Sequence, residues 1–233
     1  MAPNRLVDEE FRSIAIEPVG RLKFQDAVNM LMVFMVSAYS EWDHYYRQCS
    51  LAELGWELGK PRPILVDYLQ RGLLPRGGKA LDLCCGVATN TIYLAQNGFQ
   101  VTAIDISKTA ITIAKLKAHK AKVSISFQEN SFVDLPFGDG EFDFIYDMGC
   151  FHHVEWEDRP RFIAGIYRVL KEGGIYMLTC FSYRNGPAWN HFNRDQLIDL
   201  FDGLFELGNI RHYSSIEGDG VTRFFYTVLM KRL

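Results

Sequence analysis

The segment at residues 79–105 constrains the fold of this chain more than any other. An apolar run is followed by a turn at Gly86, an amphipathic stretch at residues 89–97 and a second apolar run that ends at Asp105. This pattern predicts a strand, a helix and a parallel strand, which is the βαβ unit of α/β proteins. A carboxylate at the end of the second strand of such a unit can accept hydrogen bonds from both hydroxyls of a nucleoside ribose.

The glycine spacing of the turn indicates which kind of nucleotide fits. A dinucleotide fingerprint needs three glycines, and the corresponding positions here are Cys84, Gly86 and Thr89. Because only Gly86 is a glycine, the backbone has little clearance for a pyrophosphate. The turn therefore disfavours an NAD-dependent oxidoreductase and favours a nucleoside that carries an amino-acid tail.

Composition narrows the class of protein. At 233 residues and 48% hydrophobic content, the chain is long enough for one α/β domain with an added segment. The net charge is −3 without a basic stripe, so no nucleic-acid partner is expected. The five cysteines include no C-x-x-C pair, which indicates a reducing, cytoplasmic location rather than a disulfide framework. The apolar run at residues 27–39 is too short to span a bilayer, and no secretory signal opens the chain.

The order of predicted elements divides the chain into two parts. Residues 1–78 are predicted to form a helical lid that covers a substrate, and residues 79–233 an alternating core, within one structural domain overall. Helices are predicted at residues 24–48, 64–71, 89–97, 108–121, 159–170 and 194–201. Beyond the first two strands, strands are predicted at residues 124–128, 142–146 and 175–181, with a final hairpin from residues 205–214 and 221–231.

The turn resembles the first motif of the class I S-adenosylmethionine (SAM) methyltransferases, an acidic residue followed by alternating glycines. Asp82 and Gly86 match that motif, whereas Cys84 and Ala88 depart from it. The resemblance continues in order through residues 135–143, 146–154 and 168–174. It implies an α/β, Rossmann-like, doubly wound, seven-stranded and mostly parallel sheet with an antiparallel last strand and an N-terminal helical lid. The implied cofactor is SAM, with S-adenosylhomocysteine (SAH) as the product.

Residues 147–153 are similar to a run in methyltransferases of the thiopurine, thiol and tellurite-resistance type. Trp42, Tyr46 and Trp56 look like parts of the substrate lid of those enzymes. The resemblance implies transfer of a methyl group by direct displacement to a small-molecule acceptor, with a thiol or another chalcogen as nucleophile. Oxygen and nitrogen acceptors, or a non-catalytic SAM-binding protein, are the alternatives.

Ligands of open α/β sheets lie beyond the carboxyl ends of the strands, and this rule collects the candidate cofactor residues. They are Asp82, Cys84, Gly86, Ala88, Asp105, Ile106, Asn130, Ser131, Phe132 and Asp147. Asp105 is expected to bind the ribose and Asp82 to fix the loop near the methionine amino group. Asn130 or Ser131 is expected near the adenine amine. Phe132 is interpreted either as a surface for the adenine or as core.

Three side chains after the fourth predicted strand are the candidate catalytic residues. Asp147 is expected either to order the methionine end of SAM or to accept a proton from the nucleophile. His152 or His153 is a candidate general base, with structural capping or packing as the alternative for the pair. Cys84, Cys150 and Cys180 lack ligand spacing within any one element, so no metal is expected.

Overall fold

The computed structural model describes residues 41–186 and 190–233. Most of the long helix predicted at residues 24–48 therefore lies outside the described residues. Its last part, residues 41–48, is helical and ends where the sequence predicts. The described part of the expected lid, residues 41–78, continues into the sheet without a break in the described chain.

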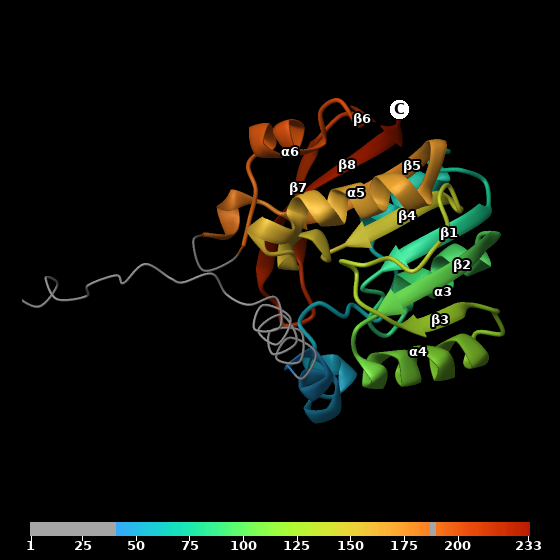
Figure 1. The fold of residues 1–233 in the computed structure, drawn as a ribbon. Helices are drawn as coiled ribbons and strands as arrows, with labels where there is room; N and C mark the ends of the chain where they lie inside the picture. Colours follow the sequence, from blue (N-terminus) through green and yellow to red (C-terminus); the bar gives the residue numbers. More distant parts are fainter. Residues whose placement is uncertain (1–40, 187–189) are drawn as a thin grey trace, which may run out of the picture. The chain divides into compact units, whose positions relative to one another are not determined.

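Eight strands of the described residues form one sheet in the order β3-β2-β1-β4-β5-β8-β6, with β7 also paired to β8 (Figure 1). The first five strands are parallel, and the last three run antiparallel to them or to one another. The strands are β1 (Gly78–Leu83), β2 (Phe99–Asp105), β3 (Ser126–Glu129), β4 (Phe142–Met148), β5 (Leu170–Phe181), β6 (Phe205–Leu207), β7 (Arg211–Ile216) and β8 (Thr222–Arg232). The mostly parallel, Rossmann-like sheet is therefore confirmed.

The count of eight strands differs from the expected seven because the penultimate strand is interrupted. β6 and β7 pair with successive parts of the same edge of β8. Between them, the backbone N–H of Gly208 donates to the Leu229 carbonyl at 2.8 Å, and a Cβ at Gly208 would lie 2.9 Å from that oxygen. Residues 208–210 belong to neither strand, so one predicted strand becomes two.

The start of β5 also differs from the prediction. The preceding helix was expected to end at the Gly173–Gly174 pair, but it ends at Val169 and β5 begins at Leu170. The register with β4 jumps from the pair Phe142 and Leu170 to the pair Phe144 and Ile175, so the glycines lie in a bulge within the strand.

Two of the α-helices, α4 (Lys108–Lys120) and α6 (Arg194–Phe201), begin at side-chain caps. The Ser107 hydroxyl accepts the Ala110 N–H at 3.0 Å, and Asn193 forms a capping box with Gln196. The α-helices are α2 (Pro63–Gln70), α3 (Thr89–Gln96), α4 (Lys108–Lys120), α5 (Arg159–Val169) and α6 (Arg194–Phe201). Short 3₁₀ helices are η1 (Leu51–Glu53), η2 (Phe151–His153), η3 (Trp156–Asp158) and η4 (Tyr183–Asn185).

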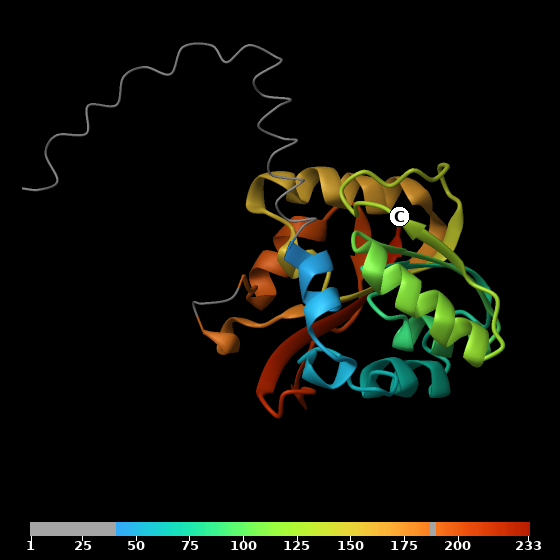
Figure 2. The same ribbon diagram turned by 90° about the horizontal axis from the view of Figure 1, so that it is seen from below.

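Helices cover both faces of the sheet, with α5 on one side and α2 and α3 on the other (Figure 2). Alternate strand residues point to opposite faces, and the core divides accordingly. Leu81 and Ile145 pack in the core that contains α5, whereas Ala80 and Phe144 pack in the core that contains α2. This doubly wound packing leaves the carboxyl ends of the strands uncovered by either helix layer, at the point between β1 and β4 where the strand order reverses.

Candidate active site

A cavity of about 380 Å³ lies at the carboxyl ends of the central strands, a size typical of small-molecule sites. Ten of the residues singled out from the sequence line it: Trp42, Tyr46, Trp56, Cys84, Gly86, Asp105, Ile106, Phe132, His152 and His153. Five others do not line it: Asp82, Ala88, Asn130, Ser131 and Asp147. The structure thus brings together residues from the described N-terminal segment and from the ends of β1, β2 and β4.

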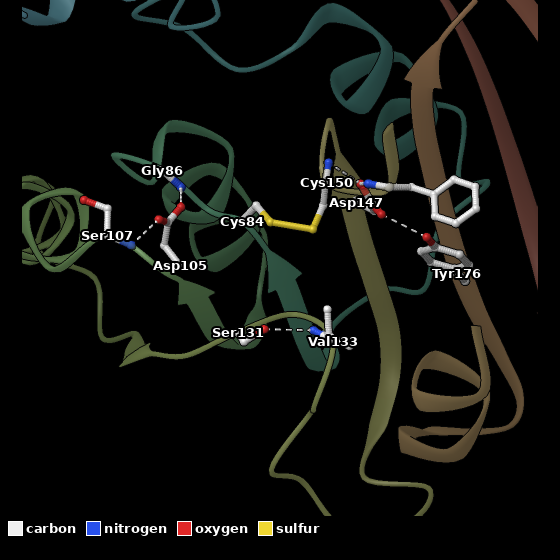
Figure 3. The surroundings of a disulfide bond; sticks show 10 residues. Cys84, Gly86, Asp105, Ser107, Ser131, Val133, Asp147, Cys150 and Tyr176 are labelled. Carbon is white, nitrogen blue, oxygen red and sulfur yellow. Dashed lines mark hydrogen bonds between the residues drawn. A yellow bond between two sulfur atoms is a disulfide. The ribbon is translucent and has the colours of Figure 1, made fainter. Parts of the chain in front are cut away.

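Asp105 ends β2 beside the turn that follows β1. Its two carboxylate oxygens accept the backbone N–H groups of Gly86 and Ser107, each at 2.8 Å (Figure 3). Burial raises its pKa to about 6, against the effect of these two hydrogen bonds, and nearby Asp43 raises it further. Each oxygen of an ionised carboxylate keeps a second lone-pair direction, so Asp105 can still accept two hydroxyl groups.

The turn after β1 explains why this position favours alternating glycines. Cys84, Gly86 and Ala88 all have a positive φ, at 51°, 54° and 64°. This left-handed conformation is free of strain for glycine and costs other residues roughly 1–2 kcal/mol. Cys84 and Ala88 therefore depart from the motif in side chain while keeping the backbone conformation that the turn requires.

Gly86 is the one position of the three where a side chain would also collide with the rest of the site. A Cβ there would lie 2.8 Å from the Tyr46 hydroxyl oxygen. That hydroxyl in turn accepts the indole N–H of Trp56 at 3.3 Å. The residues that precede the sheet thus contact the β1 turn directly, and they do so through a hydroxyl placed over a glycine.

A disulfide joins Cys84 to Cys150, with a Cα–Cα distance of 5.6 Å (Figure 3). It links the turn after β1 to the turn after β4, which are 66 residues apart in the sequence. The expectation that the cysteines form no disulfide therefore differs from the structure. Spacing along the chain did not reveal the pair, because neighbouring parallel strands bring together residues that are distant in the sequence.

Asp147 and Asp82 are fully buried next to this linkage. Asp147 accepts the backbone N–H of Cys150 at 2.8 Å and the hydroxyl of Tyr176 at 2.9 Å. Asp82 accepts the hydroxyl of Thr91 at 2.6 Å. Burial raises the pKa of each carboxyl to about 7. Neither side chain lines the cavity: Asp147 holds the turn after β4, and Asp82 links β1 to α3 through Thr91.

The two histidines of η2 have different environments. His152 is stacked on Phe181 with ring centroids 3.9 Å apart, and its Nδ1 accepts the backbone N–H of Phe181 at 3.2 Å. Burial lowers its pKa well below the usual value, so the neutral ring carries its proton on Nε2 and is a donor there. Burial lowers the pKa of His153 to about 4, and its ring meets the edge of Trp42 at 4.9 Å. Both rings are therefore neutral at pH 7.

Of the three candidate residues in the turn after β3, only Phe132 lines the cavity. The Ser131 hydroxyl accepts the N–H of Val133 at 3.2 Å. Asn130 donates its backbone N–H to the carbonyl of Asp105, and its side-chain oxygen accepts the N–H of Ser131. In this structure Asn130 and Ser131 are thus engaged in the turn itself, and Phe132 is the member that faces the cavity.

Several residues that line the cavity were not predicted. They come from the start of α2 and from the β7–β8 hairpin: Arg62, Glu217, Asp219, Arg223 and Phe225. The sequence around residues 218–220 was interpreted only as a turn. Glu217 before that turn and Asp219 within it were the signal available, but nothing in the sequence indicates that the hairpin returns to the carboxyl ends of β5 and β4.

A cofactor with a ribose and an adenine fits these features. Asp105 keeps acceptors for two hydroxyls, the turn at Gly86 presents backbone rather than side chain, and Phe132 and Ile106 add apolar surface beside it. Within residues 41–186 and 190–233, no group of three or more His, Cys, Asp or Glu side chains is placed to hold a metal ion. The same part of the chain contains no helix with the length and apolarity needed to cross a bilayer.

Comparison with known proteins agrees with this geometry. Residues 80–174 match the family model described as a methyltransferase domain. An uncharacterized methyltransferase of Synechocystis is 40% identical over 130 residues, which cover 56% of this chain and 57% of that protein. The chain thus spans little more than half of that relative. An uncharacterized methyltransferase of Schizosaccharomyces pombe is 32% identical over 127 residues, which cover 54% of this chain and 86% of that protein.

The fold is also found among solved structures. The 1,6-didemethyltoxoflavin-N1-methyltransferase of Burkholderia thailandensis, with bound 1,6-didemethyltoxoflavin and SAH, aligns with a TM-score of 0.63 at 17% identity. The alignment covers 93% of this chain and 94% of that one. Sheet order, the βαβ turn with its carboxylate and the relatives in sequence lead to one conclusion. The chain belongs to the class I SAM-dependent methyltransferases.

Proposed function

We propose that this protein transfers a methyl group from SAM to a small-molecule acceptor, with a thiol as the preferred nucleophile. The observation that carries the proposal is His153, a neutral imidazole on the wall of the same cavity that contains Asp105. The finer resemblance to the thiopurine, thiol and tellurite-resistance type, based on residues 147–153, supports the same acceptor.

The carboxyl ends of β1 and β2 would hold the cofactor. Asp105 binds the two ribose hydroxyls, the backbone at Gly86 lies against the cofactor, and Phe132 packs on the adenine. SAM would supply a methyl group activated by its bond to a sulfonium: a substrate heteroatom attacks the methyl carbon in line, the carbon–sulfur bond breaks, and SAH leaves. The contribution of the protein is therefore alignment and the exclusion of water.

His153 would accept the proton that the nucleophile loses. Burial lowers its pKa to about 4, so it is unprotonated at neutral pH but is a weak base. A thiol has a pKa of roughly 8.5 and is a far stronger acid than an aliphatic alcohol. A weak base beside the acceptor thus suits a thiol better than an alcohol, which favours sulfur over oxygen.

His152 and Asp147 would position that base rather than take part in proton transfer. The backbone N–H of Phe181 occupies Nδ1 of His152, which fixes the tautomer of that ring. Asp147 accepts N–H groups at the start of η2, the short helix that carries both histidines. Asp147 would therefore act by holding the turn that carries the histidines, and Asp82 by holding α3 against β1 below the turn at Gly86.

The aromatic residues of the described N-terminal segment would close the site. Trp42 contacts His153, and Trp56 contacts Trp42 with ring centroids 5.6 Å apart. Together with Tyr46 they form part of the cavity wall. We assign to residues 41–78, the described part of the expected lid, the role of covering the acceptor, which removes water from the reacting atoms.

A matched panel of acceptors tests the proposal. Purified protein is incubated with SAM and thiophenol, phenol or aniline, and both SAH and the methylated product are measured by mass spectrometry. We expect S-methylation to exceed O- and N-methylation. A preference for phenol or aniline would overturn the choice of sulfur, and SAH binding without transfer to any acceptor would indicate a non-catalytic protein.

We also propose that the protein is cytoplasmic and that it has no nucleic-acid partner. The Cys84–Cys150 disulfide bears on the location, because thiols are kept reduced in the cytosol. Alkylation of free thiols in fresh cell extract, followed by peptide mass spectrometry, measures whether Cys84 is bonded in the cell. Full alkylation of Cys84 would support a reducing location, and protection would contradict it.

A further inference from the structure

The cavity has two ends that different strands provide. Cys84 follows β1 and Asp105 ends β2, on one side of β4 in the sheet. Phe181 ends β5 and Phe225 lies on β8, on the other side of β4. If the cofactor occupies the β1–β2 end, as the proposed function holds, the acceptor occupies the β5–β8 end, and His153 lies near the boundary after β4.

The walls of the β5–β8 end are aromatic. Phe181 and Phe225 pack with ring centroids 5.3 Å apart, and Arg62, which lies over the Phe225 ring, donates to the carbonyl of Trp56. The Trp56 ring meets Trp42 edge to face. Trp56 is 40% exposed although it lines a cavity, so its ring retains surface that a ligand can cover. Aromatic walls of this kind gain more from a flat ring than from a saturated ring of similar size, because edge and face contacts add to the burial of apolar area.

Both cationic side chains at this end are already paired. Arg62 donates to Glu217 at 2.6 Å and to the carbonyl of Trp56 at 2.9 Å. Arg223 forms two hydrogen bonds to Asp219, at 2.8 and 2.7 Å. Within the described residues, these are the arginine or lysine side chains that line the cavity. An anionic acceptor would have to compete with a carboxylate for either guanidinium.

The charge on the whole cavity wall also opposes an anion. The lining includes four carboxylates and two guanidiniums, and both histidines are neutral at pH 7. Glu217 and Asp219 pair with the two arginines, so the surplus is Asp105 at the β1–β2 end and Glu57, which accepts the Thr89 hydroxyl at 2.7 Å. A wall with an excess of negative charge lowers the local concentration of anions and repels them when they bind.

We infer that the acceptor is a planar aromatic compound that carries no negative charge. The aromatic contacts determine its shape, and the paired arginines with the surplus carboxylates determine its charge. This inference rests on the proposed function for the placement of the acceptor, but it concerns binding and is measured without turnover.

Binding of unreactive S-methylated ligands tests the inference. The affinities of thioanisole, cyclohexyl methyl sulfide and 4-(methylthio)benzoate are measured by calorimetry at pH 7.5, with and without saturating SAH. We expect thioanisole to bind about fivefold more tightly than the cyclohexyl compound, from its ring contacts. We expect it to bind about tenfold more tightly than the benzoate, from charge repulsion. Equal affinities, or tighter binding of the benzoate, would overturn the inference.

Two tryptophan variants test whether the preference for an aromatic ring comes from the aromatic wall of the cavity. Trp56→Leu keeps an apolar side chain but removes the ring, and should reduce the preference for thioanisole over the cyclohexyl compound to near unity. Trp156→Leu, at an exposed tryptophan that does not line the cavity, is the matched control. A preference that survives Trp56→Leu, or is lost equally in Trp156→Leu, would contradict the role of the aromatic wall.

The charge variant is Asp219→Asn, which removes one carboxylate from the wall. It should improve the affinity for the benzoate about threefold relative to thioanisole. Asp139→Asn removes a carboxylate that pairs with Arg168 at 3.1 Å outside the cavity, and should leave the ratio unchanged. If Asp219→Asn leaves the ratio of the benzoate and thioanisole affinities unchanged, the charge argument is contradicted. If the proposed methyl transfer fails while the predicted affinities hold, only the proposed function is overturned.

Discussion

The two ends of the cavity are built in different ways. At the β1–β2 end, backbone turns at the ends of parallel strands hold Asp105 between two N–H groups and Cys84 in a disulfide. At the β5–β8 end, side chains form the surface, and they come from the segment before the sheet and from an antiparallel hairpin. The first end depends on backbone conformation and tolerates few replacements. The second can change its lining without changing the sheet, so specificity for an acceptor can diverge while cofactor binding stays the same.

The largest expected effect concerns the covalent link at the β1–β2 end. Cys150→Ser opens a loop of 66 residues and should lower the free energy of unfolding by about 4 kcal/mol in the chain-entropy model. Urea unfolding without reductant measures it. Wild-type protein treated with reductant should show the same loss, and Cys49→Ser, at a free cysteine, should not. Unchanged stability would mean that the β1–β2 end owes its order to the strands alone.

The next largest expected effect is the loss of SAH affinity when the proposed ribose acceptor is removed. Asp105→Ala eliminates hydrogen bonds to a charged group that are worth about 1.5–3 kcal/mol each, so SAH affinity should fall at least about 100-fold by calorimetry. It also leaves the N–H groups of Gly86 and Ser107 without their acceptor. Asp139→Ala, at an exposed carboxylate, is the control. Wild-type affinity in Asp105→Ala would show that the cofactor does not use the β2 carboxylate.

His153 lies between the two ends, and its replacement should separate binding from chemistry. His153→Gln should lower kcat for a thiol about 100-fold, the lower range for loss of a general base. SAH affinity should be unchanged, since Asp105 and Gly86 are untouched. His44→Gln alters an exposed histidine of the helical residues 41–48 and should leave kcat at the wild-type value. Equal loss of kcat in both variants, or none in either, would contradict a proton acceptor at His153.

The effect of pH on SAH affinity should be smaller than the effects of these substitutions. It should arise from a carboxyl group at the β1–β2 end of the cavity. Burial raises the pKa of Asp105 to about 6, so the carboxylate gains a proton and loses acceptor capacity as the pH falls through 6. The dissociation constant should therefore rise about tenfold between pH 7 and pH 5. In Asp105→Asn the tenfold change in dissociation constant should disappear. This variant therefore distinguishes titration of Asp105 from titration of Asp82 and Asp147. An equal slope in the variant would assign the effect to those two carboxyls instead.

The same contrast explains how much the sequence could predict. The βαβ unit, its turn and Asp105 follow from local patterns of apolar residues, caps and breakers, and the structure has them where the sequence placed them. The positive φ values at Cys84 and Ala88 are hidden in the sequence because neither residue is a glycine. Cys84 and Ala88 therefore differ from the motif only in having side chains, because their backbone keeps the conformation that glycine would adopt.

The β5–β8 end was less predictable because its contacts join distant parts of the chain. Arg62 and Glu217 form an ion pair across 155 positions, and no periodic pattern encodes such a pair. The interruption after Leu207 and the bulge at the start of β5 arise from pairing with neighbouring strands, so local propensity does not reveal them. Trp42, Tyr46 and Trp56 were identified only from the resemblance to the lid of other methyltransferases. The pattern of apolar residues alone does not single them out.

The Cys84–Cys150 disulfide makes a covalent ring of the chain between these two residues, with α3, β2, α4, β3 and β4 inside it. The connection from β3 to β4, residues 130–141, also lies inside this ring. A protease that cuts the chain there once would leave both fragments joined, and the protein would still migrate as one molecule on a gel without reductant. Only a reductant would then separate an N-terminal fragment, which carries Asp105, from a C-terminal fragment, which carries His153.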